Sequence, residues 1–198
     1  MNRRTFLLGS AVAAAATAVR ARPAARAAVT DLDFASAEEV ARAIRRGDVS
    51  SFELTTHTFE RIKRYNPRLN AIVTLTEDSA LARARAADEA RTRGEWWGHL
   101  HGVPCTIKGT FEMVGVRATA GVSSLAQYVP ARDAVVVERY RAAGAVILGK
   151  TNVPEWAADW QSYNAIFGAA NNPWDLSRTP GGSSGGEAAA LAAELSHL

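Results

Sequence analysis

Two kinds of side chain in this sequence could do chemistry together: serine hydroxyls in a glycine-rich loop, and a lysine that ends an apolar run. The loop consists of Gly181, Gly182, Ser183, Ser184, Gly185 and Gly186. Four glycines let the backbone approach a ligand closely and adopt conformations that other residues resist. The lysine is Lys108, at the end of the β-branched run that begins at Gly102. Burial at a strand end should lower its pKa and make a neutral amine available as a base.

The glycine-rich loop also allows other interpretations. A phosphate-binding loop needs a following Lys-Ser or Lys-Thr, or a G-x-G-x-x-G spacing after a strand, and neither is present. A nucleophile elbow would use Ser184, because residues 182–186 satisfy G-x-S-x-G. An elbow needs a preceding strand and a following acid and histidine, whereas here a proline-rich turn precedes it. The plainest alternative is that Lys108 lies on the surface and the loop is a flexible turn.

Other residues that could carry chemistry are interpreted as structural. His99 and His101 lack a third metal-ligating partner nearby, so we expect turn residues and no metal site. Cys105, the only cysteine, lies three residues before Lys108, and strand alternation places it on the opposite face. No histidine is positioned to activate it, so we predict a buried structural thiol. The five tryptophans are expected mainly in the core, although Trp156 and Trp160 could line an acyl pocket.

The elements that must position these residues alternate between helix and strand. Ser36 and Glu39 form a capping box at the start of a helix that Gly47 ends. Ser50 or Ser51 should cap the next helix. The patterns predict helices over 36–46, 51–66, 78–93 and 133–142 and from 187 onward, and strands over 70–76, 102–108 and 145–148. This alternation indicates an α/β fold.

Composition and charge narrow the possible partners. The 198 residues are 47% hydrophobic and 22% charged, which is typical of a soluble globular protein. The formal net charge is +3, but the first 27 residues contain five arginines and no acid. Without these 27 residues, the chain has 18 basic and 20 acidic residues. This balance offers no electrostatic case for phosphate binding, so nucleic acid is disfavoured as a partner.

The basic N-terminus has the pattern of an export signal. Arg3 and Arg4 precede an alanine-rich apolar stretch over 7–19, which matches a twin-arginine signal. The stretch is too short to span a bilayer, and residues 25–27 supply a small-x-small cleavage pattern. We predict a twin-arginine signal peptide over 1–27, export to the periplasm or cell exterior, and no stable membrane insertion after cleavage. The alternative is an N-terminal amphipathic helix or an uncleaved anchor.

Three longer motifs resemble a known family. The segments 100–108, 149–156 and 172–186 are similar, in the same order, to those of the amidase signature family. The resemblance implies an α/β fold, an α/β/α sandwich with a mixed central sheet. It also implies hydrolysis of the C–N bond of carboxylic amides by a Ser-cisSer-Lys mechanism. The implied substrate is a small-molecule amide, with no metal or organic cofactor.

The resemblance also implies a role for each residue. The lysine matching Lys108 takes a proton from the bridging serine matching Ser183, which follows a cis peptide and deprotonates the acyl nucleophile. Supporting loop residues are Gly181, Gly182, Ser184, Gly185 and Gly186. Gly109 departs from the pattern, because the family usually has an acidic residue after the lysine.

The position of the nucleophile sets an expectation for the whole chain. In the family it lies about two dozen residues beyond the bridging serine, in a loop that also forms the oxyanion hole. This chain ends 15 residues past Ser183. We therefore expect residues 28–198 to be the N-terminal part of an amidase domain, incomplete at its C-terminus, and the isolated chain to be inactive. The alternatives are a non-catalytic remnant or interaction subunit, and a protein like the amidotransferase subunit of tRNA-dependent amidation, against which the export signal argues.

Overall fold

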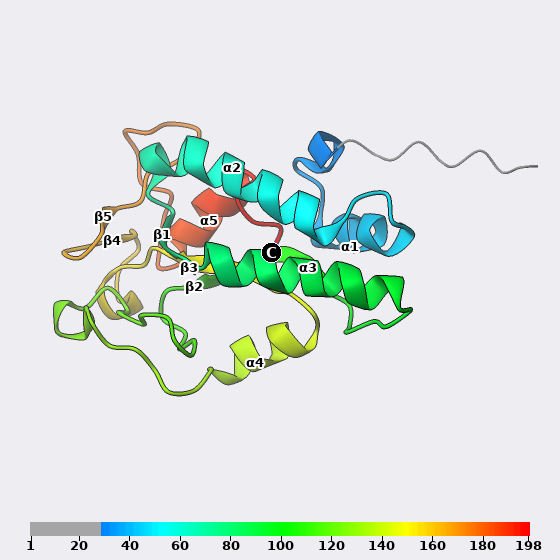
Figure 1. Cartoon of the computed structure of the whole chain (residues 1–198). Coiled ribbons are helices and arrows are strands. Elements are labelled where there is room, and N and C mark those ends of the chain that lie inside the picture. The colour runs from blue at the N-terminus through cyan, green and yellow to red at the C-terminus, as the bar shows by residue number, and fades with distance from the viewer. Residues whose placement is uncertain (1–28) are drawn as a thin grey trace, which may run out of the picture.

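The computed structural model describes residues 29–198, in which helices and strands alternate as predicted (Figure 1). The predicted signal peptide lies outside the described residues. The helices are α1 (Ala37–Arg46), α2 (Ser51–Leu69), α3 (Glu77–Thr92), α4 (Val135–Ala142) and α5 (Gly185–Ala192). The strands are β1 (Ile72–Leu75), β2 (Pro104–Lys108), β3 (Val146–Thr151), β4 (Tyr163–Asn164) and β5 (Gly168–Ala169). Short 3-10 turns are η1 (Val29–Leu32), η2 (Ser123–Leu125) and η3 (Glu155–Ala157).

The main sheet is mixed, as predicted. Its strand order is β1-β3-β2, with β1 antiparallel and β2 parallel to the central β3. In the β2–β3 pairing, Lys108 lies opposite Thr151. The strands β4 and β5 form a separate antiparallel pair.

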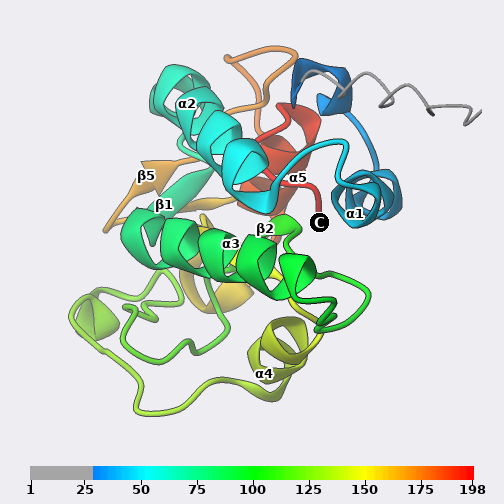
Figure 2. The ribbon, with the colours of Figure 1, turned by 45° about the vertical axis from the view of Figure 1, so that its right-hand side comes forward.

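Helices cover both faces of this sheet. On one face, Ile147 of β3 packs in a cluster with Val137 of α4. On the other face, the neighbouring Leu148 packs with Phe59 of α2, Ala84 of α3 and residues of α5. Figures 1 and 2 show the same arrangement, with α4 on the opposite side of the sheet from α2 and α5. These three layers confirm the predicted α/β architecture.

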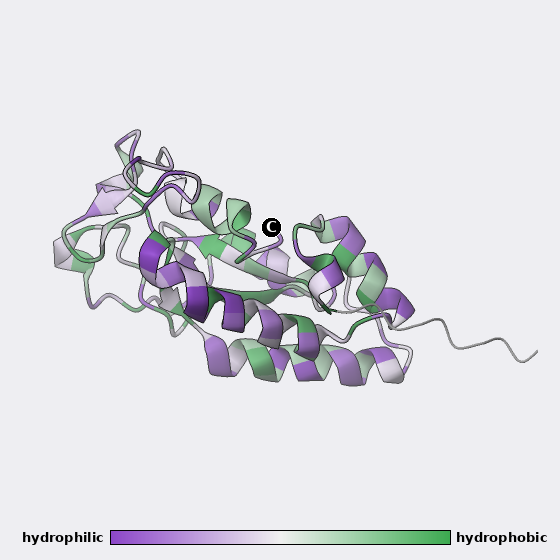
Figure 3. Ribbon diagram, turned by 90° about the horizontal axis from the view of Figure 1, so that it is seen from above, coloured by the Kyte–Doolittle hydropathy of each residue, from purple (hydrophilic) through white to green (hydrophobic). Residues whose placement is uncertain are grey.

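Helix α3 packs through alanine. Its buried residues are Ala80, Ala84, Ala87 and Ala90. In Figure 3 the strands are mostly green, whereas the outer turns of the long helices carry many purple, hydrophilic residues. Small side chains let the helix lie close to the sheet while its charged residues remain in water. Within residues 29–198, no helix is both long and apolar enough to cross a membrane.

The predicted capping signals place the first two helices. Ser36 Oγ accepts from the backbone N–H of Glu39 at 3.3 Å, and the Glu39 carboxylate accepts from the Ser36 N–H at 2.8 Å. Gly47 ends α1 in the left-handed region, at φ 78°. Of the two serines expected to cap α2, Ser50 does so.

The predicted end of α2 at Asn66 and Pro67 is wrong, because the helix continues to Leu69. Pro67 lacks an N–H and so removes one intrahelical hydrogen bond, a cost that the burial of Leu69 in the core offsets. Asn70 then ends the helix in the left-handed region, at φ 47°. The Asn66 side chain accepts from the N–H of Ile72 at 2.9 Å, which ties the helix end to β1.

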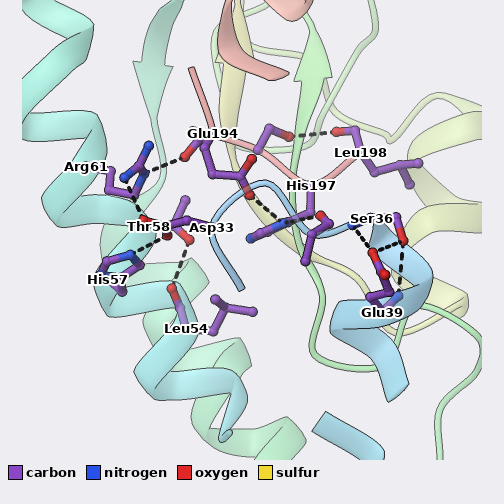
Figure 4. A network of polar contacts seen from close by, with 12 residues as sticks. Asp33, Ser36, Glu39, Leu54, His57, Thr58, Arg61, Glu194, His197 and Leu198 are labelled. Atoms are coloured by element: carbon purple, nitrogen blue, oxygen red, sulfur yellow. Dashed lines mark hydrogen bonds and ion pairs between the residues drawn. The ribbon is translucent and has the colours of Figure 1, made fainter. Parts of the chain in front are cut away.

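A polar network joins the segment before α1 to α2 and to the last residues of the chain (Figure 4). Asp33 pairs with His57 at 2.7 Å and with Arg61 at 2.9 Å. Arg61 also donates to the carbonyl oxygen of Glu194 at 3.0 Å. The buried Glu194 carboxylate lies 3.0 Å from Nδ1 of His197. These contacts hold both ends of the described chain on α2.

Gly186 provides a test of how closely α5 approaches the sheet. A Cβ at this position would lie 2.7 Å from the carbonyl oxygen of Ala71 and closer still to the backbone of Asn152. We expect Gly186→Ala to lower the free energy of unfolding by about 3 kcal/mol, because backbone cannot yield as a side chain can. Urea unfolding measures this effect, with Ala188→Ser on the exposed side of α5 as a control. Stabilisation, the usual result of Gly→Ala in a helix, would show that the close contact is absent.

Candidate active site

The last residue of β2 meets the first serine of the glycine-rich loop. Lys108 Nζ donates a hydrogen bond to Ser183 Oγ at 2.8 Å, across 75 residues of sequence. Strand alternation turns Lys108 towards α5, while Cys105 and Ile107 pack with Val137 of α4 on the other face. The structure therefore brings together the two residues that sequence analysis singled out.

The electrostatics of Lys108 favour its neutral form. Burial lowers the pKa of Lys108 below its usual value. Within residues 29–198, no carboxylate forms a salt bridge with Lys108 to offset this effect. A larger fraction of the amine is therefore unprotonated near neutral pH than for a surface lysine. An unprotonated amine at this distance can accept the proton of the Ser183 hydroxyl.

The loop that carries Ser183 is pressed against a neighbouring segment. The Gly182–Ser183 peptide bond is cis, as the resemblance implies. A Cβ at Gly182 would lie 2.6 Å from both the Gln161 nitrogen and the Trp160 carbonyl carbon. Only glycine fits this approach without displacing backbone. Gly181 adopts φ 90°, which also favours glycine.

The rest of the loop begins α5. The N–H of Gly185 donates to Ser162 Oγ at 2.8 Å, and that of Gly186 to the carbonyl oxygen of Asn152 at 3.2 Å. Ser184 stands exposed at the N-cap position, with no capping hydrogen bond from its side chain. The preceding loop contains no strand, and His197 instead contacts Glu194 and the carbonyl oxygen of Ala35. The described residues thus do not assemble a nucleophile elbow around Ser184.

The other candidates have structural environments. Cys105 is fully buried, and desolvation raises the pKa of its thiol. His101 is also buried, with Nε2 3.0 Å from the carbonyl oxygen of Ala87 and its ring stacked on Trp96. Among residues 29–198, no group of three or more His, Cys, Asp or Glu side chains is arranged to hold a metal ion.

The expectation that the tryptophans lie mainly in the core is wrong for three of them. Trp156, Trp160 and Trp174 are 62%, 88% and 86% exposed. They lie between β3 and the glycine-rich loop, in a stretch whose regular elements are only two or three residues long. The backbone of Trp160 touches Gly182, so this exposed residue borders the glycine-rich loop.

Sequence analysis missed Glu187. Its carboxylate accepts hydrogen bonds from the hydroxyls of Thr106 on β2 and Thr151 on β3. Burial raises its pKa, and the two hydrogen bonds oppose that shift. The sequence did contain a sign of its importance, because Glu187 is the single acid in the otherwise apolar first turns of the alanine-rich segment.

The strand predicted over 145–148 extends further in the structure, so Lys150 lies within β3. The strand extends to Thr151 because it is central and pairs on both sides, with Lys150 opposite Thr74 and Ile107. Lys150 is 1% exposed, and its Nζ donates to the carbonyl oxygen of Arg117 at 3.1 Å. Burial lowers its pKa to about 8.

The lowered pKa of Lys150 predicts a pH dependence of stability. The unfolded chain binds more protons than the folded chain between pH 8 and the ordinary lysine value of about 10.4, so stability should rise across that range. The increment should be about 3 kcal/mol for this group. We expect Lys150→Met to remove it, and Lys63→Met, at a 61% exposed side chain, to retain it. Urea unfolding at several pH values would contradict this if all three proteins gained stability equally.

The fold and the site together define a class: an α/β protein with a lysine–serine pair where a sheet strand meets a glycine-rich loop. The chain belongs to the amidase family, whose model matches residues 53–198. A second model, for a twin-arginine translocation pathway signal sequence, matches residues 1–19.

The chain is similar to relatives that are much longer. It is 47% identical over 157 residues to a glutamyl-tRNA(Gln) amidotransferase subunit of Thioalkalivibrio sulfidiphilus, covering 79% of this chain and 32% of that protein. The same subunit of Carboxydothermus hydrogenoformans is 44% identical over 163 residues, covering 82% and 34%. The chain thus spans about a third of the length of the curated relatives that it matches.

The solved structures that this chain matches are also longer than it is. A 6-aminohexanoate cyclic dimer hydrolase with bound substrate superposes with a TM-score of 0.74 at 36% identity, covering 82% of this chain and 33% of that one. A bacterial aryl acylamidase of the amidase signature family gives 0.79 at 29% identity, covering 84% and 35%. Each likeness covers more than four-fifths of this chain.

Proposed function

We propose that this chain supplies the base and the proton bridge of an amide hydrolase. Lys108 is the base, Ser183 is the bridge, and the supporting loop is Gly181, Gly182, Ser184, Gly185 and Gly186. The observation that carries the proposal is the 2.8 Å hydrogen bond between Lys108 Nζ and Ser183 Oγ. Membership of the amidase family supports it.

The proton path follows from this geometry. Neutral Lys108 accepts the Ser183 proton, and Ser183 then accepts the proton of an attacking hydroxyl. The hydrogen bonds of residues 29–198 bring no second serine hydroxyl to Ser183. We therefore assign the acyl nucleophile and its oxyanion donors to polypeptide outside these residues, and expect the 198-residue chain alone to leave amides intact.

The substrate class we propose is a small-molecule carboxylic amide. The similar solved structures include a cyclic dimer hydrolase and an aryl acylamidase, which supports this class. The reaction needs no redox step or group carrier, so we assign no cofactor. The match to a twin-arginine signal supports export, and we propose cleavage after Ala27 and a periplasmic or extracellular destination for residues 28–198.

A fusion enzyme tests the function. Residues 29–198 of this chain replace the corresponding third of 6-aminohexanoate cyclic dimer hydrolase, which they match at 36% identity. We expect the fusion enzyme to hydrolyse the cyclic dimer, and the 198-residue chain alone to show no turnover. A fusion enzyme that folds, by circular dichroism and thermal melting, but does not hydrolyse amides would contradict the proposal and favour a non-catalytic remnant.

The curated relatives favour one second candidate, part of an amidotransferase that acts on glutamyl-tRNA(Gln). The 47% identity to such a protein supports it, whereas the match to an export signal argues against it. A fusion of residues 29–198 to the remainder of that relative, tested within the assembled amidotransferase, separates the two. Amidation of glutamyl-tRNA(Gln) supports the amidotransferase candidate, and hydrolysis of simple amides without tRNA supports the exported hydrolase.

A further inference from the structure

One half-buried carboxylate belongs to the helix that follows Ser183. Glu187 stands in the first turn of α5, four residues after Ser183. Its carboxylate accepts hydrogen bonds from Thr106 on β2 and from Thr151 on β3, the latter at 3.2 Å. Both threonines are buried. The proposed proton path makes no use of this group.

The two threonines flank Lys108 on the sheet. Thr106 precedes Lys108 by two residues, so both side chains point to the same face of β2. Thr151 is the residue opposite Lys108 in the β2–β3 pairing. The two donors, Thr106 and Thr151, therefore lie on the strands next to Lys108. The acceptor, Glu187, lies on α5, the helix that directly follows Ser183 and Ser184.

We propose that Glu187 is a positioning residue, which fixes the start of α5 against β2 and β3 and so sets the position of Ser183 relative to Lys108. The proposal rests on the proposed function, because it concerns the same pair. It is independent of which amide is hydrolysed.

Glu187 is the one polar side chain of α5, whose other residues are glycine, alanine and leucine. The helix packs on the sheet through Ala189 and Ala190, whose methyl groups interlock weakly with their neighbours. The other contacts of its first turn are made by the backbone N–H groups of Gly185 and Gly186. Glu187 contributes the side chain that bonds to two strands at once, and hydrogen bonds to a carboxylate are directional and strong.

The pKa of Lys108 reports this positioning. If α5 moves away, Lys108 loses Ser183 and gains water, so its pKa should return towards the usual lysine value. Loss of the negative charge of Glu187 alone would act in the opposite direction, lowering the pKa of Lys108. The sign of the change therefore separates positioning from a through-space charge effect.

The chain is well suited to this measurement because it contains three lysines, at positions 63, 108 and 150. We would label the whole 198-residue chain with carbon-13 and nitrogen-15 at lysine and titrate each Nζ resonance by NMR. We expect Glu187→Ala to raise the pKa of Lys108 towards the ordinary lysine value, with the resonance of the surface Lys63 as the internal control. An unchanged or lowered pKa of Lys108 in the folded variant would overturn the proposal.

Two further variants exclude a purely structural role. Ala188→Gly weakens α5 by lowering its helix propensity without touching the carboxylate, so it should leave the pKa of Lys108 unchanged. Glu187→Gln can accept from one threonine and donate to the other, so it should keep the pKa of Lys108 near that of the wild type. A rise in the Ala188→Gly variant, or a Gln variant that behaves like Ala, would count against positioning by Glu187.

The proposal can still be tested if the Glu187→Ala variant does not fold. Should Glu187→Ala not fold, Thr151→Val removes one of the two hydrogen bonds at nearly constant volume. A raised pKa of Lys108 in that variant supports the proposal, and an unchanged one contradicts it. Because the titration involves no turnover, its result is distinct from failure of the fusion enzyme to hydrolyse amides.

Discussion

Replacing Lys108 with alanine in the fusion enzyme should lower kcat/KM for amide hydrolysis by about 10³-fold, the size of effect that loss of a general base produces. The amine is the group that accepts the Ser183 proton, at a distance of 2.8 Å. Lys108→Arg should be as inactive as Lys108→Ala, because a guanidinium keeps the positive charge but does not deprotonate. Steady-state kinetics on the cyclic dimer measures both.

The control for Lys108 is another lysine. Lys63→Ala changes a side chain that is 61% exposed and paired with Glu77 on the surface, so its activity should match that of the parent fusion enzyme. Because burial lowers the pKa of Lys108, activity should rise with pH through a midpoint below the ordinary lysine value of about 10.4. An active Lys108→Arg variant would show that the base lies elsewhere.

Replacing Ser183 with alanine should also lower kcat/KM by about 10³-fold, whereas Ser184→Ala should change it by less than about tenfold. The two serines are adjacent and chemically identical, yet only Ser183 contacts Lys108. Ser184 is exposed at the start of α5, and its side chain makes no capping hydrogen bond. Comparing kcat/KM of the two single variants therefore measures how much the hydrogen bond between Lys108 and Ser183 contributes to catalysis.

The Ser183 and Ser184 variants also decide between two mechanisms. A large loss in Ser184→Ala with an active Ser183→Ala would favour the nucleophile elbow, in which Ser184 attacks the substrate. Thermal melting of both variants should lie close to that of the parent fusion enzyme. If Ser183→Ala lost activity together with its folded structure, the kinetic loss would not count as evidence for a proton bridge.

Local patterns were sufficient to predict much of the scaffold. The capping box at Ser36 and the left-handed glycine at Gly47 lie where the sequence placed them, and Ser50 is the one of two expected serines that caps α2, because a cap depends on residues within one turn. Two predicted ends of elements were wrong. Pro67 was expected to end α2, but the helix continues past it to the buried Leu69. The strand predicted over 145–148 extends to Thr151, because β3 pairs on both edges.

The sequence by itself determined the motifs of this protein: a lysine at the end of an apolar run, a loop of four glycines and two serines, and an alternation of helix and strand. These features are short-range, so composition and spacing reveal them. Only the tertiary structure decided that Glu187 bonds to two strands and that Trp160 stands exposed beside the loop. Each of these facts depends on contacts between segments tens of residues apart. The packing of the whole chain sets such contacts, and no local pattern encodes them.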